Sequence, residues 1–339
     1  MLRRATVADN GAILLGVNVV ADGFAERIVR IVTHAHSDHI RGLSRSARFS
    51  ISIIATPTTF EFLRVLGYRI PGEKVLPLPY NTPVEIDGER IVLRPARHIA
   101  GSAQVEVEGD TYRVGYTGDF KVPGTPPMED LDVLVLDATY GMPGMQRRWT
   151  DYDALAALIG LIERFIWQGP VWIYGFHGKL QEIMVELRRR GVEYEFMAEP
   201  KIIEMARIAS RFYGVRVDPV RPYLGGSVDE SVIVFVHESK RRGKRRLPGV
   251  HVRLTGWEMR DIVWPTGPRS FNVSYSDHAR LSEIIEYLED ARPRLVVIDN
   301  FRGRGAWATA RYIERTLGIP ARAEPVNPIG VRRGEARGY

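Results

Sequence analysis

The chain contains Thr33-His34-Ala35-His36-Ser37-Asp38-His39-Ile40-Arg41-Gly42-Leu43, which places three imidazoles and one carboxylate within six residues. The preceding residues, 28–32, are rich in β-branched side chains and predict a buried strand. The histidines therefore lie on a tight loop at the end of a strand. On such a loop His34 and His36 can point toward one metal ion, while Asp38 and His39 reach a second position nearby. Imidazole and carboxylate ligands suit zinc and also tolerate manganese. The stretch thus predicts a metal site and not a polar loop that happens to be rich in histidine.

The composition is that of an ordinary globular protein. The 339 residues are 45% hydrophobic and 26% charged, which is enough to bury a full core in one large domain or in two. The absence of cysteine excludes disulfides and thiolate zinc sites, so histidine and carboxylate remain as the strong metal ligands. We find neither an apolar run as long as a membrane span nor a charged-then-apolar signal at the N-terminus. We therefore expect a cytoplasmic protein without a membrane partner.

The positive charge of the chain is concentrated in one place. The net charge is +6, which favours polyanionic partners. Residues 240–246 alone hold six positive charges, in the order Lys240-Arg241-Arg242-Gly243-Lys244-Arg245-Arg246. This run is either a solvated surface loop or a contact for phosphate groups. Its arginines, Arg241, Arg242, Arg245 and Arg246, are candidate substrate contacts.

The periodicity of the chain changes near residue 150. Before this point, short apolar stretches predict successive strands, one of them over 12–21 and a nearly all-apolar, central one over 131–136. After it, strands alternate with helices, including a helix over 200–213, and this alternation predicts a small parallel sheet covered by helices.

Helices over 281–291 and 306–317, with a strand between them, then resume the first domain. A further strand over 269–273 is expected to belong to that domain as well. The expected domains are therefore a first part over 1–145, an inserted domain over 146–262, a second part of the first domain over 263–325, and a basic flexible tail over 326–339.

The H-x-H-x-D-H pattern of residues 34–39 resembles the signature of the metallo-β-lactamase superfamily. Two later segments are similar to further metal motifs of that family, in the right order: Arg97-His98-Ile99-Ala100-Gly101-Ser102-Ala103-Gln104 and Tyr116-Thr117-Gly118-Asp119-Phe120-Lys121. Two others resemble motifs of its β-CASP branch, whose members cut nucleic acids: Leu136-Asp137-Ala138-Thr139-Tyr140-Gly141 and Ser274-Tyr275-Ser276-Asp277-His278-Ala279. The resemblance implies an α/β fold, a metallo-β-lactamase αββα sandwich with an inserted β-CASP α/β cap.

The resemblance also implies which side chains hold metal. The ligands carried over by motif match are His34, His36 and His98 for one ion, with Asp38, His39 and Asp119 available to a second. Asp119 would bridge the two, and Asp38 and Asp119 would also take part in catalysis. The implied cofactor is zinc, as one ion or two, with manganese or magnesium as other possibilities. Asp22 resembles the first motif of the family, in which the carboxylate orients the ligand loop by hydrogen bonds.

Four further residues have assigned or open roles. By resemblance, His278 contacts the scissile phosphate and protonates the leaving oxygen, and Asp137 orients it. Asp299 stands where RNA-processing relatives usually have a histidine, and it is either a turn carboxylate or a ligand of the second metal. Lys179 begins a helix after a strand, where it and the helix amides could receive a phosphate.

Within the β-CASP branch, three segments look most like the Artemis-type and DNA-ligase-associated DNA exonucleases, a group similar to mRNA 3′-end processing factors: Gly101-Ser102-Ala103-Gln104, Thr117-Gly118-Asp119-Phe120-Lys121 and Thr255-Gly256-Trp257-Glu258-Met259-Arg260. The missing histidine at 299 also favours DNA. We interpret the chain as a metal-dependent 5′-to-3′ DNA exonuclease of DNA repair that acts on single-stranded or 5′-ended DNA. The alternative is a β-CASP exoribonuclease or endoribonuclease. A thioester or lactone hydrolase would need neither the cap nor the basic run. Which protein partners the chain has is left open by the sequence.

Overall fold

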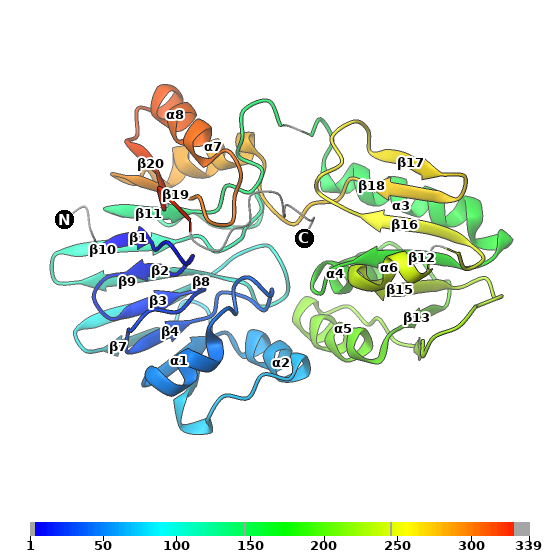
Figure 1. Ribbon diagram of the computed structural model, residues 1–339, viewed down its shortest axis with the longest axis horizontal. Helices are drawn as coiled ribbons and strands as arrows, with labels where there is room; N and C mark the ends of the chain where they lie inside the picture. Colours follow the sequence, from blue (N-terminus) through cyan, green and yellow to red (C-terminus); the bar gives the residue numbers. More distant parts are fainter. Residues whose placement is uncertain (1–3, 146, 245, 329–339) are drawn as a thin grey trace. The chain divides into compact units, whose positions relative to one another are not determined.

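The structure, a computed structural model, describes residues 4–145, 147–244 and 246–328. These residues form two compact units (Figure 1). The first unit comprises the described residues up to 145 together with those from His278 onward, and the second comprises 147–277. Each unit is described below by itself.

Two sheets form the centre of the first unit. One has the strand order β1-β2-β3-β4-β5-β6 and is parallel from β3 to β6. Its strands are β1 (Ala5–Val7), β2 (Ile13–Leu15), β3 (Val19–Ala21), β4 (Val29–Ile31), β5 (Ser52–Ala55) and β6 (Val75–Pro77). The strand expected over 12–21 is thus a hairpin of β2 and β3, with Gly16 in the turn at a φ of 59°.

The second sheet of this unit has the order β20-β19-β11-β10-β9-β8-β7. Its strands are β7 (Pro83–Ile86), β8 (Glu89–Pro95), β9 (Ala103–Gly109), β10 (Tyr112–Tyr116), β11 (Val133–Leu136), β19 (Val296–Asp299) and β20 (Ala321–Glu324). β11 lies between β10 and β19, parallel to both, and is buried along its whole length. Its all-apolar sequence predicts this central position, because both faces of such a strand must be covered.

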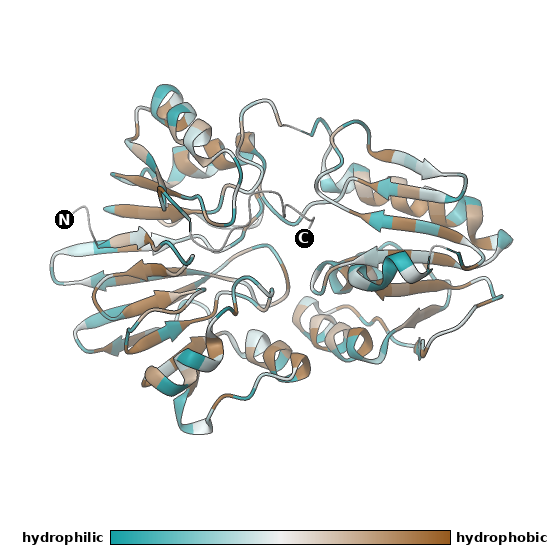
Figure 2. Cartoon of the chain, in the orientation of Figure 1, coloured by the Kyte–Doolittle hydropathy of each residue, from teal (hydrophilic) through white to brown (hydrophobic). Residues whose placement is uncertain are grey.

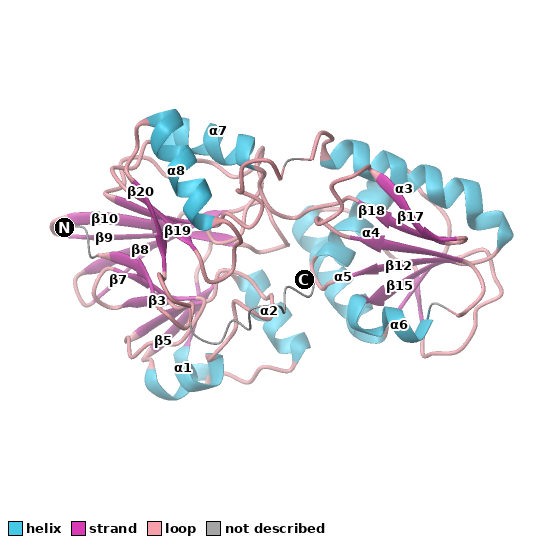
Figure 3. Ribbon diagram, turned by 45° about the horizontal axis from the view of Figure 1, so that its top comes forward, coloured by secondary structure: helices cyan, strands magenta, loops and turns pink. Residues whose placement is uncertain are grey.

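Apolar side chains of both sheets meet in one core, which includes Ile31, Ile54, Leu93, Val105 and Val135. The opposite face of the second sheet packs against α7 (Leu281–Ala291) and α8 (Ala306–Leu317) through a separate apolar cluster. α1 (Leu43–Phe49) and α2 (Pro57–Leu66) lie beyond the first sheet (Figures 1 and 3). Hydropathy follows these layers, since the strands are mostly apolar and the helices are apolar on one side only (Figure 2). The expected αββα sandwich is confirmed.

The second unit is a sheet of order β14-β13-β15-β12-β16-β18-β17 with helices packed on it. Its helices are α3 (Asp151–Phe165), α4 (Lys179–Arg189), α5 (Pro200–Tyr213) and the short α6 (Arg241–Lys244), and its strands are β12 (Val171–Gly175), β13 (Phe196–Ala198), β14 (Val220–Pro222), β15 (Ile233–His237), β16 (Val250–Leu254), β17 (Val263–Gly267) and β18 (Ser270–Val273). The strands are parallel except for the β17–β18 hairpin. This is the parallel sheet that the alternation of strands and helices predicts.

The expected return to the first domain at residue 263 is wrong. β18 pairs in parallel with β16, with Leu254 opposite Val273, and β17 folds back onto β18. Both strands therefore belong to the second unit, and the chain re-enters the first unit at His278. A strand pattern shows that a segment is extended but not which sheet supplies its neighbour. Of the expected tail over 326–339, residues 329–339 lie outside the described residues.

No helix in the described part of the chain combines the length and the apolar composition that a membrane-spanning segment requires.

Candidate metal centre

The histidine loop follows β4 and is fixed from beneath by Asp22, a fully buried carboxylate. Asp22 Oδ1 accepts a hydrogen bond from Thr33 N at 2.9 Å, and Asp22 Oδ2 lies 2.7 Å from His39 Nδ1. A carboxylate only accepts, so Nδ1 of His39 carries the proton and its Nε2 faces the opposite way. Asp22 thereby holds both ends of the loop, which is the orienting role that the family resemblance implies.

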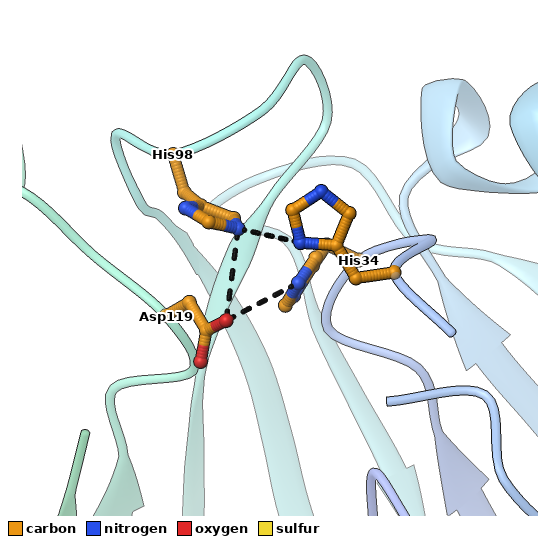
Figure 4. Close-up of side chains that lie close together, drawn as sticks. His34, His98 and Asp119 are labelled. Carbon is orange, nitrogen blue, oxygen red and sulfur yellow. Dashed lines mark hydrogen bonds and ion pairs between the residues drawn. The ribbon is translucent and has the colours of Figure 1, made fainter. Parts of the chain in front are cut away.

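Four side chains from three loops converge on one point. His34, His36, His98 and Asp119 each offer one atom within 4.8 Å of the others. His98 Nε2 lies 3.0 Å from His36 Nδ1 and 3.6 Å from Asp119 Oδ2, and His34 Nε2 lies 3.5 Å from the same Asp119 oxygen. Figure 4 shows His34, His98 and Asp119 pointing toward one another from separate segments of the chain. His98 follows β8 and Asp119 follows β10, so strand ends of both sheets supply the cluster.

The chemistry of this cluster fits a cation. The Nε2 atoms of His34 and His39 are buried and make no hydrogen bond among the described residues, although Asp119 Oδ2 lies 3.5 and 3.1 Å away. Burial also lowers the pKa of His34 well below its ordinary value, and the neighbouring imidazoles lower it further. A neutral imidazole has the free lone pair that a metal needs. The buried His and Asp side chains therefore form a metal-binding site.

Asp38 and His39 lie on the other side of Asp119. His39 Nε2 is 3.3 Å from Asp38 Oδ2 and 3.1 Å from Asp119 Oδ2, so the His39 ring lies between two carboxylates at the second position that the family resemblance implies. Among the described residues, these three side chains do not form a group whose ligand atoms all lie within 4.8 Å of one another. Burial raises the pKa of Asp38, but the charges of His39 and then Arg302 outweigh it and the net pKa is lowered. Asp38 is therefore ionised.

Asp137 and His278 form a pair beside Asp119, although 141 residues separate them in sequence. His278 Nδ1 lies 2.9 Å from Asp137 Oδ2, and its Nε2 lies 3.9 Å from Asp119 Oδ2. Asp137 Oδ1 accepts hydrogen bonds from Thr139 N at 2.9 Å and from Thr139 Oγ1 at 2.7 Å. These bonds hold Asp137 in one orientation, and Asp137 in turn fixes the ring of His278. The His278 side chain is 16% exposed and can reach a substrate.

Asp299 belongs to none of the groups of His and Asp side chains that could hold a metal ion among the described residues. These groups are His34, His36, His98 and Asp119; Asp22, His34 and His39; and Asp119, Asp137 and His278. Its Oδ1 accepts from Phe301 N at 2.8 Å, and its Oδ2 lies 2.8 Å from Arg302 Nη1. Both oxygens are therefore used within a turn, which favours the turn role over the ligand role. Arg302 is a site residue that sequence reasoning missed. Its only sequence signal is the i,i+3 spacing from Asp299.

The expected substrate contacts differ in accessibility. Lys179 is 3% exposed and its Nζ lies 3.1 Å from Asp277 Oδ1, and both facts argue against the expected phosphate contact by Lys179. Arg241 pairs with Glu238 at 2.9 Å and is 16% exposed, whereas Arg242 and Arg246 are exposed. Arg245 lies outside the described residues. Of the three arginines that the structure describes, two are thus placed to meet a polyanion.

Comparisons with known proteins agree with this fold. Residues 27–158 match a family model described as "Beta-lactamase superfamily domain". The chain is 37% identical over 137 residues to an uncharacterised protein in the lig 3′ region of Acidianus ambivalens, a match that covers 40% of this chain and 97% of that protein. A solved structure of a protein of unknown function from Enterococcus faecalis V583 has a TM-score of 0.59 at 13% identity, covering 88% of this chain and 80% of that one. This last likeness concerns the fold alone.

Two named relatives are more distant. An RNase of Saccharolobus solfataricus is 28% identical over 193 residues, which covers 48% of this chain and 39% of the RNase. Protein artemis of Homo sapiens is 23% identical over 303 residues, covering 76% of this chain and 43% of Artemis. This chain thus spans less than half of the length of either relative. The chain belongs to the metallo-β-lactamase superfamily and, within it, to the β-CASP branch.

Proposed function

We propose that the chain is a metal-dependent phosphodiesterase, specifically a 5′-to-3′ DNA exonuclease of DNA repair, and that its second unit is the β-CASP cap. The observation that supports this best is the Asp137–His278 pair next to the metal-binding cluster. A thioester or lactone hydrolase needs the metal site but has no phosphate to neutralise and no use for an oriented imidazole beside it. The pair supplies a proton donor whose nitrogen lies 3.9 Å from Asp119, at the edge of the site where a leaving oxygen would depart.

The side chains divide the work as follows. Zinc, or manganese or magnesium in its place, would be held by His34, His36, His98 and Asp119 and would supply Lewis-acid charge beside a phosphoryl oxygen. Asp137 Oδ2 accepts a hydrogen bond from the Nδ1–H group of His278 and so aims Nε2 at the substrate. His278, when protonated, attracts the phosphate and gives its Nε2 proton to the leaving oxygen. Asp38 and Asp119 complete the site as carboxylates that would orient the attacking water.

DNA is the first candidate for the substrate, as single strands or 5′ ends. Residue 299, where RNA-processing relatives usually have a histidine, is an aspartate whose carboxylate is bonded to Arg302, and this supports DNA as the substrate. RNA is the second candidate, because one relative is named an RNase.

A digestion assay separates these substrates. We expect 5′-phosphorylated single-stranded DNA to shorten from its 5′ end, so that a 5′ label is released as a mononucleotide while a 3′ label stays on progressively shorter strands. A chelator should stop the reaction, and zinc or manganese should restore it. Duplex DNA and RNA of the same sequence are compared in parallel. Cutting of RNA alone would favour the alternative, and intact DNA and RNA with both metals supplied would contradict the nuclease proposal.

The exposed arginines of the basic run should contribute to binding. Replacing Arg242 and Arg246 with alanine should weaken binding of single-stranded DNA uniformly across sequences. With each phosphate contact that is lost, fewer counterions are released from the DNA when the protein binds. The slope of log K against log salt should fall by about 0.7 for each contact. Arg311 and Arg315, exposed on α8, are the matched control, since their replacement removes the same charge. Fluorescence anisotropy at several salt concentrations measures both slopes. Equal slopes for the wild type and the R242A/R246A variant would remove the run from the binding surface.

A further inference from the structure

Arg302 lies against the second position of the metal centre. Its Nη1 lies 2.8 Å from Asp299 Oδ2, and its Nη2 donates to the backbone carbonyls of Asp22 and, at 3.5 Å, of Asp38. Its Nε lies 3.9 Å from Asp38 Oδ2, and the side chain is only 6% exposed. The guanidinium therefore bridges Asp22 directly after β3, the metal loop and the turn after β19, and cannot move away without breaking buried bonds.

A second guanidinium lies beneath the same loop. Arg30 is fully buried, and its Nη2 donates to the backbone carbonyl of His39 at 2.7 Å. Arg30 and Arg302 thus contact the backbone of the two neighbouring residues, His39 and Asp38, that would ligate a second ion. Guanidinium groups keep their positive charge at any ordinary pH. The part of the centre formed by Asp38 and His39 therefore already has two permanent positive charges beside it, those of Arg30 and Arg302.

We propose that Arg302 takes the place of a second divalent cation, so that the centre binds one ion tightly at His34, His36, His98 and Asp119 and disfavours another at Asp38, His39 and Asp119. This inference rests on the proposed metal centre and deepens it. A divalent ion bound to Asp38 would lie within a few ångströms of a buried positive charge, where little water screens the repulsion. Asp38 would also have to share its negative charge between the ion and Arg302.

Asp299 sets the strength of this effect. Its carboxylate offsets part of the charge of Arg302, which is then felt less strongly at Asp38. Removing the charge of Arg302 and removing the charge of Asp299 should therefore change the affinity for a second ion in opposite directions. A purely structural role of the pair predicts no such opposition.

Metal stoichiometry tests the proposal without reference to activity. The wild-type chain and the variants Arg302→Gln, Arg302→Lys and Asp299→Asn are dialysed against graded zinc or manganese, and bound metal is measured by elemental analysis. We expect one tight ion in the wild type and in R302K, and a second ion bound at least tenfold more tightly in R302Q. D299N should bind the second ion more weakly than the wild type. The double variant D299N/R302Q removes both charges of the pair. Its affinity for the second ion should rise above that of the wild type, as in R302Q, but by a smaller factor.

The outcomes separate this proposal from the one that it rests on. Two equally tight ions in the wild type, or equal second-ion affinities in the wild type and in R302Q and D299N/R302Q, would overturn the role of Arg302 and leave the nuclease proposal intact. No bound ion in the wild type would overturn the metal centre itself. Should R302Q fail to fold, circular dichroism will show it, and D299N/R302Q then decides.

Discussion

Replacing His278 with asparagine should lower the rate of cutting by about 10²- to 10⁴-fold, the usual contribution of a positioned general acid. Asparagine can still bond to Asp137 but has no proton to give to a leaving oxygen at neutral pH. The metal content should stay at the wild-type level, because His278 lies 3.9 Å from Asp119 and outside the cluster of His34, His36, His98 and Asp119. Single-turnover digestion and elemental analysis of the same preparation measure the two quantities.

The control for this variant is His237→Asn, which changes a partly exposed histidine of the second unit. H237N should retain both metal and activity. His278 also lies in another possible metal cluster with Asp119 and Asp137, so the metal content of H278N decides between the proton-donor and ligand roles of His278. Loss of metal from H278N would mean that His278 is a ligand, and the proposed division between metal binding and proton transfer would be abandoned.

Asp137→Asn should also lower the rate of cutting, since an amide no longer secures the orientation of the His278 ring.

Much of the fold follows from local sequence signals. The helices expected over 200–213, 281–291 and 306–317 match α5, α7 and α8, and each has a physical start or stop signal. Pro200 begins α5, and Gly214 and Gly318 end α5 and α8 in the left-handed conformation that glycine adopts at low cost. Such signals act within a few residues, so the sequence alone contains them.

The parts that the sequence did not predict depend on distant partners. Lys179 follows a glycine at a strand-to-helix turn, a pattern typical of phosphate contacts, yet its charge is satisfied by Asp277, almost a hundred residues later. Arg302 gives no sign in the sequence that its guanidinium reaches Asp22 and Asp38, because loops of both sheets must first come together. The turn at Gly16 lies within an apolar run that has the pattern of a single strand. Only the folded chain shows the need for glycine there, because a side chain at this position would collide with Glu89. Local pattern gives the elements, and tertiary packing decides which charges meet.

The largest loss is expected from His36→Ala, which should abolish both metal binding and cutting. His36 supplies one of four converging ligands, and its Nδ1 lies 3.0 Å from His98 Nε2. Two histidines and one carboxylate would remain, with water in place of the lost ligand, and this smaller donor set holds zinc far less tightly. Bound zinc should fall to less than about one tenth of the wild-type level, because ligand loss costs more than the 10- to 100-fold typical of orienting partners.

The loss of zinc binding in H36A should also appear as a loss of zinc-dependent thermal stability, which can be measured without any substrate. A ligand that binds only the folded state adds about 4 kcal/mol when its concentration is a thousandfold above its dissociation constant. Thermal unfolding of the wild type should therefore shift upward as zinc is added and shift back with chelator, whereas H36A should melt at one temperature under both conditions. H237N, which retains the centre, should follow the wild type. A zinc-dependent melting shift of full size in H36A would show that the cation is held elsewhere, and the assignment of the centre to the strand-end histidines would fail. The proposed chemistry would fail with it, because the cation at this centre is what would place a phosphate beside His278.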